Sequence, residues 1–160
     1  MKRFKEKLKG YSLAELVLAI GIFAIMSSML VFLVIDATRT LENSRYRTKA
    51  AQLTQDIYSS LKLIKSKTWY DLAIHTNDGP KHVEYSLGNY SIVDGEGTQD
   101  NLTYSFTIDD VPRDINRNIV ETGGTVDPHT RLINITITWI DRLGNIHTIS
   151  PKMYLNDWNT

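Results

Sequence analysis

The chain has 160 residues, of which 42% are hydrophobic, and its 18 lysines and arginines balance its 18 aspartates and glutamates. This length predicts about one domain plus one special segment, and the zero net charge gives no general basic field for binding nucleic acid. Cysteine is absent, which excludes disulfides, cysteine-ligated zinc and a catalytic thiol.

The first ten residues form a short basic tip. Residues 16–35, which follow closely, contain no charged side chain and consist mainly of Leu, Val, Ile, Phe, Met and Ala. About 20 apolar residues cover the hydrocarbon core of a bilayer, whereas a cleaved secretory signal has a shorter apolar stretch of about 7 to 15. The sequence therefore predicts a single membrane span, with the basic tip in the cytoplasm and the remainder of the chain outside.

Beyond residue 35 the chain becomes polar, but no helix breaker occurs before residues 77–80. Apolar residues recur there at spacings of three and four, which places them on one face of a helix. That helix-sheet packing face consists of Ala50, Leu53, Ile57, Leu61 and Ile64. One continuous helix over residues 11–66 would be about 80 Å long at 1.5 Å per residue.

The second half of the chain carries strand patterns. Residues 82–87 and 90–93 alternate around Gly88-Asn89, which predicts a hairpin with a type II′ or I′ turn. Alternation over 102–108 and 133–139, and a turn over 141–145 leading into 146–150, add further antiparallel strands. Such a sheet needs cover on one face only, and the helical stripe can provide it.

The predicted fold class is therefore α+β: a long N-terminal helix whose outer half packs on a small antiparallel sheet. The predicted segments are a basic tip over 1–10, which the resemblance described next makes a leader peptide, an apolar helical half over 11–35, an amphipathic half over 36–66 and a β-rich domain over 67–160.

The N-terminal segment resembles the prepilin leader of type IV pilins and pseudopilins. The resemblance lies in a basic leader that ends at Gly10, an aromatic Tyr11, Ser12 and Leu13 after it, Glu15 as the fifth residue after the glycine, and the apolar run 16–35. The C-terminal segment 131–158 also looks like the last hairpin of minor pilins and pseudopilins. Membership would imply a pilin-like fold.

The resemblance implies a structural subunit rather than an enzyme. A prepilin peptidase would cut between Gly10 and Tyr11 and methylate the new amino group of Tyr11. The subunit would then pass from the cytoplasmic membrane, through an inner-membrane assembly platform, into a pilus or pseudopilus at the cell surface. Its partners would be other pilin subunits and the lipid bilayer, with nucleic acid involved only indirectly through DNA uptake.

Glu15 has two interpretations. A carboxylate inside an apolar span costs about 2.5 to 3.5 kcal/mol at the centre and less near the interface. In the family interpretation it pairs with the Tyr11 amine of an adjacent subunit, because opposite charges attract strongly in a dry helix bundle. In the other it is an interfacial glutamate stabilised by the N-terminus of its own helix.

Other motifs give weaker indications of a functional site. Asp94, Glu96 and Asp100 crowd oxygen ligands into a glycine-rich segment that would suit calcium, but their spacing departs from the EF-hand loop and favours a solvated turn. The histidines show no metal-ligand spacing, and no Ser/His/Asp arrangement or carboxylate pair is evident. We therefore expect no cofactor and no enzymatic activity.

Two questions stay open at this level. Abundant pilins of the family that the chain resembles often carry a proline in the membrane half of the helix and a C-terminal cysteine pair. This chain has no cysteine and no proline before Pro80, which favours a minor pilin or pseudopilin, while a cysteine-free main pilin stays open. The alternative function is a signal-anchored, single-span membrane protein whose extracellular β-rich domain binds a ligand without forming a filament.

Overall fold

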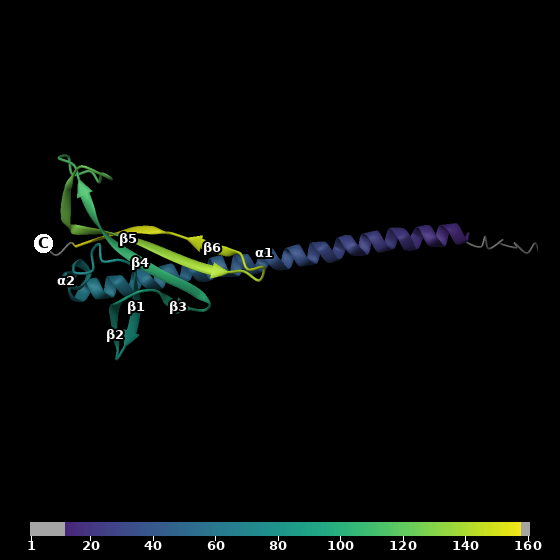
Figure 1. Ribbon diagram of the computed structural model, residues 1–160, viewed down its shortest axis with the longest axis horizontal. Coiled ribbons are helices and arrows are strands. Elements are labelled where there is room, and N and C mark those ends of the chain that lie inside the picture. The colour runs from purple at the N-terminus through teal and green to yellow at the C-terminus, as the bar shows by residue number, and fades with distance from the viewer. Residues whose placement is uncertain (1–11, 158–160) are drawn as a thin grey trace, which may run out of the picture. The chain divides into compact units, whose positions relative to one another are not determined.

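The computed structural model describes residues 12–157 (Figure 1). Two helices, α1 (Leu13–Lys67) and α2 (Trp69–Ala73), precede seven strands. These are β1 (Lys81–Ser86), β2 (Asn89–Asp94), β3 (Gly97–Gln99), β4 (Leu102–Arg113), β5 (Thr125–Ile140), β6 (Ile146–Ile149) and β7 (Lys152–Asn156). The α+β class with a long N-terminal helix and an antiparallel sheet is confirmed. The chain divides into two compact units that meet between Ser44 and Arg45.

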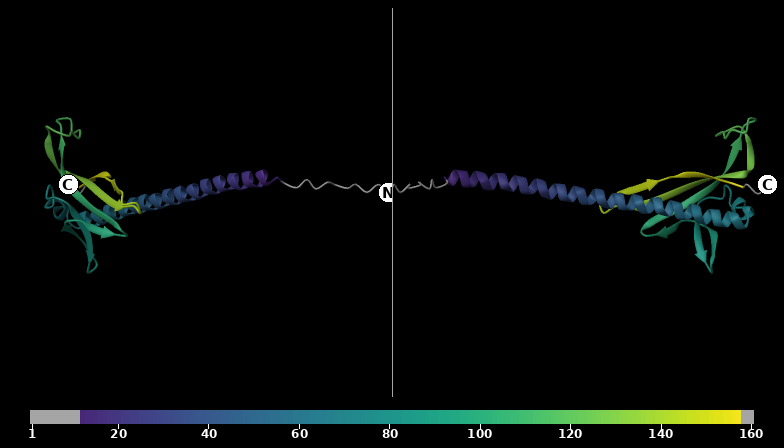
Figure 2. Two further views of the ribbon diagram at one scale, coloured as in Figure 1. Left: turned by 45° about the vertical axis from the view of Figure 1, so that its right-hand side comes forward. Right: turned by 180° about the vertical axis from the view of Figure 1, so that it is seen from behind.

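The unit from Arg45 on is built around one antiparallel sheet. Its strands follow the order β2-β1-β4-β5-β6, with β3 paired to β4 and β7 paired to β5. The long β4–β5 ladder forms the centre, for example through Phe106 opposite Ile135. Figure 2 shows from two further sides how the C-terminal part of α1 lies along this sheet.

The core lies between α1 and the central strands. The five residues of the helical stripe have at most 5% of their surface exposed, and they belong to one apolar cluster with the sheet. The sheet contributes alternate residues, because successive side chains of a strand point to opposite faces. These are Leu102, Tyr104, Phe106 and Ile108 of β4, and Ile133, Ile135, Ile137 and Trp139 of β5.

The first hairpin departs from the sequence prediction by one residue. The turn consists of Leu87 and Gly88, at φ +52° and +81°, rather than Gly88 and Asn89. Positive φ at both central residues is the type I′ geometry. The observed register places Lys81 opposite Asp94, where the two side chains form an ion pair, and sets Val83 opposite Ile92. The free energy gained from these pairings outweighs the conformational cost of placing exposed Leu87 in the left-handed region of backbone conformation.

The second hairpin turn lies where the sequence places it. The Asp141 carboxylate accepts hydrogen bonds from the backbone N–H of Leu143 and Asn145, both at 2.8 Å, and Gly144 adopts a φ of +82°. Strand β6 follows directly. Strand β7 was not predicted separately: after Pro151 the chain pairs again with β5, with Leu155 opposite Arg131.

Two further differences concern the middle of the sheet. The segment expected to be a solvated turn contains β3, whose Gly97 is buried opposite Tyr104. Strands β4 and β5 are longer than predicted, and their register shifts between Asp110 and Pro112. Such a bulge bends the strand and redirects it. The strands continue beyond it through the pair Pro112 and Val126.

Candidate functional site: the N-terminal helix segment

Helix α1 begins with a side-chain cap. The Glu15 carboxylate accepts a hydrogen bond from the backbone N–H of Ser12 at 3.0 Å, and the Ser12 hydroxyl accepts one from the N–H of Ala14 at 3.4 Å. Ser-x-x-Glu at this place is a capping box, in which the two side chains satisfy backbone donors that have no partner within the helix. No described residue bonds the second carboxylate oxygen of Glu15.

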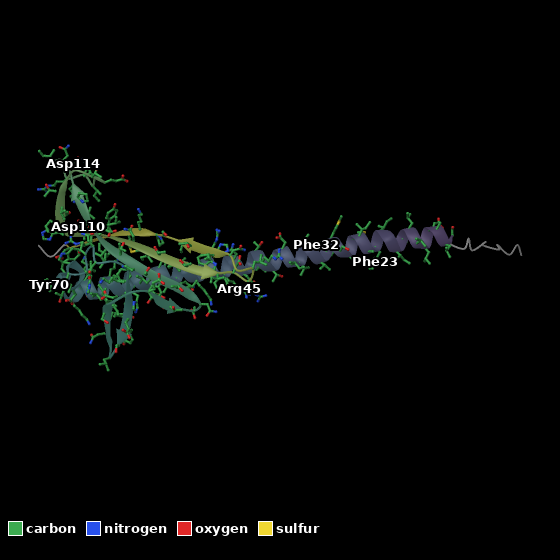
Figure 3. The ribbon with its side chains drawn as sticks, in the orientation of Figure 1. Phe23, Phe32, Arg45, Tyr70, Asp110 and Asp114 are labelled. Atoms are coloured by element: carbon green, nitrogen blue, oxygen red, sulfur yellow. The ribbon has the colours of Figure 1, made fainter. Side chains whose placement is uncertain are left out.

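The helix then continues as an apolar rod. By length and composition it is able to cross a membrane, and none of its most apolar 18-residue stretch is buried within the described part of the chain. Phe23 and Phe32, each 72% exposed, project from it in Figure 3. A helix that is apolar all round needs an apolar environment, which is either lipid or other helices.

Three hydroxyl groups, one within this apolar stretch and two just after it, bond to their own helix. The hydroxyls of Ser28, Thr38 and Thr40 donate to the backbone carbonyls of Ala24, Val34 and Asp36, at 2.8, 2.7 and 3.0 Å. An unsatisfied polar group is costly in hydrocarbon, so the bond of Ser28 suits its place in the apolar stretch.

The predicted site residues have different outcomes. Gly10 and Tyr11, the expected cleavage and methylation positions, lie outside the described residues. Glu15 lies in the first turn of α1, on the capping box. The packing stripe lies in the other unit, where it is buried under the sheet.

The three carboxylates considered for calcium do not form a cluster. Asp94 instead forms an ion pair with the Lys81 ammonium, which also bonds Asp78 at 2.7 Å. Lys81 has only 2% of its side chain exposed, and hydrogen bonds to Asp78 and then Asp94 raise its pKa. Among residues 12–157, no three His, Asp or Glu side chains come together as a metal site.

A second polar cluster lies on the β4–β5 extension. The Arg113 guanidinium donates to Asp127 at 2.6 Å, and the Thr130 hydroxyl donates to the same carboxylate oxygen at 2.7 Å. Burial acts to raise the pKa of Asp127, but the bonds from Arg113, Thr130 and the His129 backbone outweigh it and lower that pKa to about 2. The charges of Arg113 and Asp127 therefore pair with each other and stabilise the β4–β5 extension.

Aromatic rings stack at the other end of β5. Trp139 lies between Tyr46, at 6.3 Å between ring centroids, and His147, at 5.4 Å. His147 in turn lies 3.0 Å from a carboxylate oxygen of Asp141. This stack fixes the start of the packed half of α1 to the sheet, with Tyr46 contributed by the helix.

Comparison with protein-family models, curated proteins and solved structures found no significant match. The resemblance to type IV pilins therefore rests on the residues of the chain itself.

Sequence reasoning missed one local feature of this segment. The capping box is visible as Ser12-Leu13-Ala14-Glu15, a spacing that signals a helix start. Its presence means that Glu15 has a role within its own helix, which the family interpretation does not require.

Proposed function

We propose that this protein is a structural subunit, a minor pilin or pseudopilin, of a type IV pilus or related secretion or competence filament. In this proposal it is cleaved after Gly10, methylated at Tyr11 and assembled through α1. Its fold would then be pilin-like. The observation that carries the proposal is a single helix of 55 residues with two different environments: an exposed first half in which residues 16–35 carry no charge, and a second half that packs on its own sheet.

This arrangement suits a subunit that changes surroundings. The packed half is held by its own core, so the β-rich unit does not depend on what covers the apolar half. The apolar half gains stability from lipid and from neighbouring apolar helices alike, since both remove it from water. A lone charged group at its start gives such a bundle a means of fixing the register between helices.

The signal-anchored alternative has one observation in its favour. Because Glu15 already caps α1, a helix that only anchors the protein would also have a use for it. A glutamine at the same position retains the oxygen that accepts the Ser12 N–H, so it preserves the cap and removes the charge. The two roles of Glu15, charge pairing and capping, therefore predict different results for Glu15→Gln and Glu15→Ala.

The test expresses each variant in the host and measures its amount in sheared surface filaments relative to the membrane fraction. A filament subunit should lose incorporation in Glu15→Gln and Glu15→Ala alike, while Ser12→Ala, which weakens the cap and keeps the charge, should assemble. If Glu15→Gln assembles normally and only Glu15→Ala fails, the glutamate acts as a cap and charge pairing is wrong.

Processing is measured on the same samples by mass spectrometry. The proposal expects an N-terminus at Tyr11 carrying a methyl group, and expects Gly10→Val to retain the leader. A wild-type chain that keeps residues before Tyr11, and that is absent from sheared filaments, would favour the signal-anchored protein.

A further inference from the structure

A cleft of about 350 Å³ lies between the packed half of α1 and the β1–β2 hairpin. It exists because the hairpin leaves the sheet almost at once: within the described residues the β1–β4 ladder consists of the pair Lys81 and Phe106. Figures 1 and 2 show β1 and β2 as an arm that projects away from α1 and from the rest of the sheet.

One face of the hairpin forms a wall of this cleft. Cross-strand partners share a face, so Lys81 with Asp94, Val83 with Ile92 and Tyr85 with Tyr90 follow one another toward the tip. Burial falls in the same direction: Lys81 is buried, whereas Tyr85 is 64% exposed and Tyr90 is 37% exposed. The hairpin is therefore anchored at its base and presents aromatic rings near its tip.

The two tyrosines form an aromatic platform. Their ring centroids are 4.9 Å apart and their planes are tilted by 51°. Both residues line the cleft and are exposed, so part of each side chain is accessible there. The base of this wall is firm, because the Tyr104 hydroxyl donates to the carbonyl of Val83 at 3.0 Å. Exposed aromatic side chains in a concave site are typical of surfaces that bind a ligand.

The other walls add polar groups to this platform. Asp56 and Ser59 come from α1 and Gln99 comes from β3. All three are exposed, and no described residue bonds their side chains. They supply a carboxylate acceptor, a hydroxyl and an amide beside the half-exposed side chain of Leu63.

We propose that this cleft binds a saccharide, one or two pyranose rings in size. A pyranose has apolar C–H faces, which stack on aromatic rings, and hydroxyl groups around its edge, which bond to carboxylates, amides and hydroxyls. A purely apolar partner would leave Asp56, Ser59 and Gln99 desolvated without hydrogen bonds, which is costly. The cleft volume lies at the lower end of the roughly 300 to 1,000 Å³ usual for small-ligand sites.

The test uses the full chain in a detergent with a phosphocholine head group, since sugar-based detergents would compete. Cellobiose, chitobiose and maltose are titrated separately, and binding is followed by saturation-transfer NMR and isothermal titration calorimetry. At least one of the three should bind the wild type. Tyr85→Ala and Tyr90→Ala should each weaken that binding about tenfold through loss of an aromatic face.

Tyr70→Ala is the matched control, because Tyr70 is 68% exposed on α2 and does not line the cleft. It should leave the affinity unchanged. Asp56→Asn, a nearly isosteric change at an exposed position, should weaken binding without altering the circular dichroism spectrum. This second variant keeps the test valid if a tyrosine variant misfolds.

Three results would overturn the proposal. They are a wild type that binds none of the three sugars, an equal loss in Tyr70→Ala, and unchanged binding in both tyrosine variants that fold. If the sugars fail to bind and Tyr85→Ala instead reduces self-association of the chain, the cleft is an interface between copies. The proposal concerns the β-rich unit alone, so its outcome does not depend on whether the chain assembles into filaments.

Discussion

Leu61 and Leu63 of α1 offer a matched pair for testing how the helix packs. Both are leucines on the same helix, two residues apart, which separates their directions by about 200°. Leu61 is fully buried against the sheet, whereas Leu63 is 51% exposed. Leu61→Ala and Leu63→Ala remove the same atoms, so a difference in their effects measures burial at the two positions.

The expected magnitude follows from that burial. Truncating a buried leucine loses its transfer free energy and leaves a cavity, for a total of about 2 to 5 kcal/mol. The core around Leu61 is continuous from Ala50 to Leu155, so little collapse into the cavity is expected and the upper half of that range applies. A domain of ordinary stability has about 5 to 15 kcal/mol in total. Leu63→Ala should cost less than about 1 kcal/mol, since half of its side chain stays in water.

The measurement is urea unfolding of a fragment that begins at Arg39 and so contains the whole unit from Arg45 on. We expect this fragment to be soluble and folded. Both variants should keep the wild-type urea dependence, so that the shift in midpoint reports stability. Equal midpoints for the two variants would show that the stripe is not the packing face. A wild-type fragment that is unfolded would show that the core depends on residues before Arg39.

Two other predictions concern close contacts and charge. Gly97→Ala should lower the free energy of unfolding by about 1 to 3 kcal/mol, because the new Cβ would lie 2.7 Å from Cζ of Tyr104, whose hydroxyl is already bonded to Val83. An unchanged midpoint in urea unfolding would contradict this prediction. The lowered pKa of Asp127, about 2 against an ordinary 3.8, means that its ionised form stabilises the fold above about pH 4 and that this contribution disappears as the pH falls through about 2. Melting temperatures of wild type and Asp127→Asn should therefore converge between those pH values, and a constant difference would refute the role of the charge.

The main architecture was predictable because two strong periodicities run through the sequence. The helical spacing from Ala50 to Ile64 and the alternation in β4 and β5 both reflect burial of one face, and the structure buries the same residues. The turn at Asp141 was predictable because its side chain bonds to the backbone nearby, which is a local effect.

The first hairpin and β3 depend instead on contacts between residues that are distant in sequence. The turn preference of Gly88-Asn89 is overridden by the pairing of Lys81 with Asp94, which only the folded chain brings together. Gly97 reads as a loop residue, but it is required where the Tyr104 ring lies against the backbone. The cleft between α1 and the β1–β2 hairpin could not be predicted for the same reason, because Asp56, Tyr85 and Gln99 come from three separate elements.

The energetics of the apolar helix explain why the charge of Glu15 is the informative quantity. At the centre of a bilayer, each Leu, Ile, Val or Phe contributes about 0.3 to 0.6 kcal/mol to insertion. Residues 16–35 contain 13 of these, and together they favour insertion by about 4 to 8 kcal/mol. This outweighs the roughly 2.5 to 3.5 kcal/mol that a carboxylate costs at the centre, and Glu15 lies near the end of the segment, where the cost is smaller. We therefore expect insertion to be favourable with or without the glutamate, so insertion does not account for a need for the charge. Capping needs the charge only weakly, because a neutral amide oxygen also accepts the Ser12 N–H, and the helix N-terminus favours a negative charge by only about 0.3 to 1 kcal/mol. A requirement for the negative charge larger than this helix-terminus effect would have to come from a positive partner outside the described residues, and the α-amino group created by cleavage before Tyr11 is the one that the proposed function supplies.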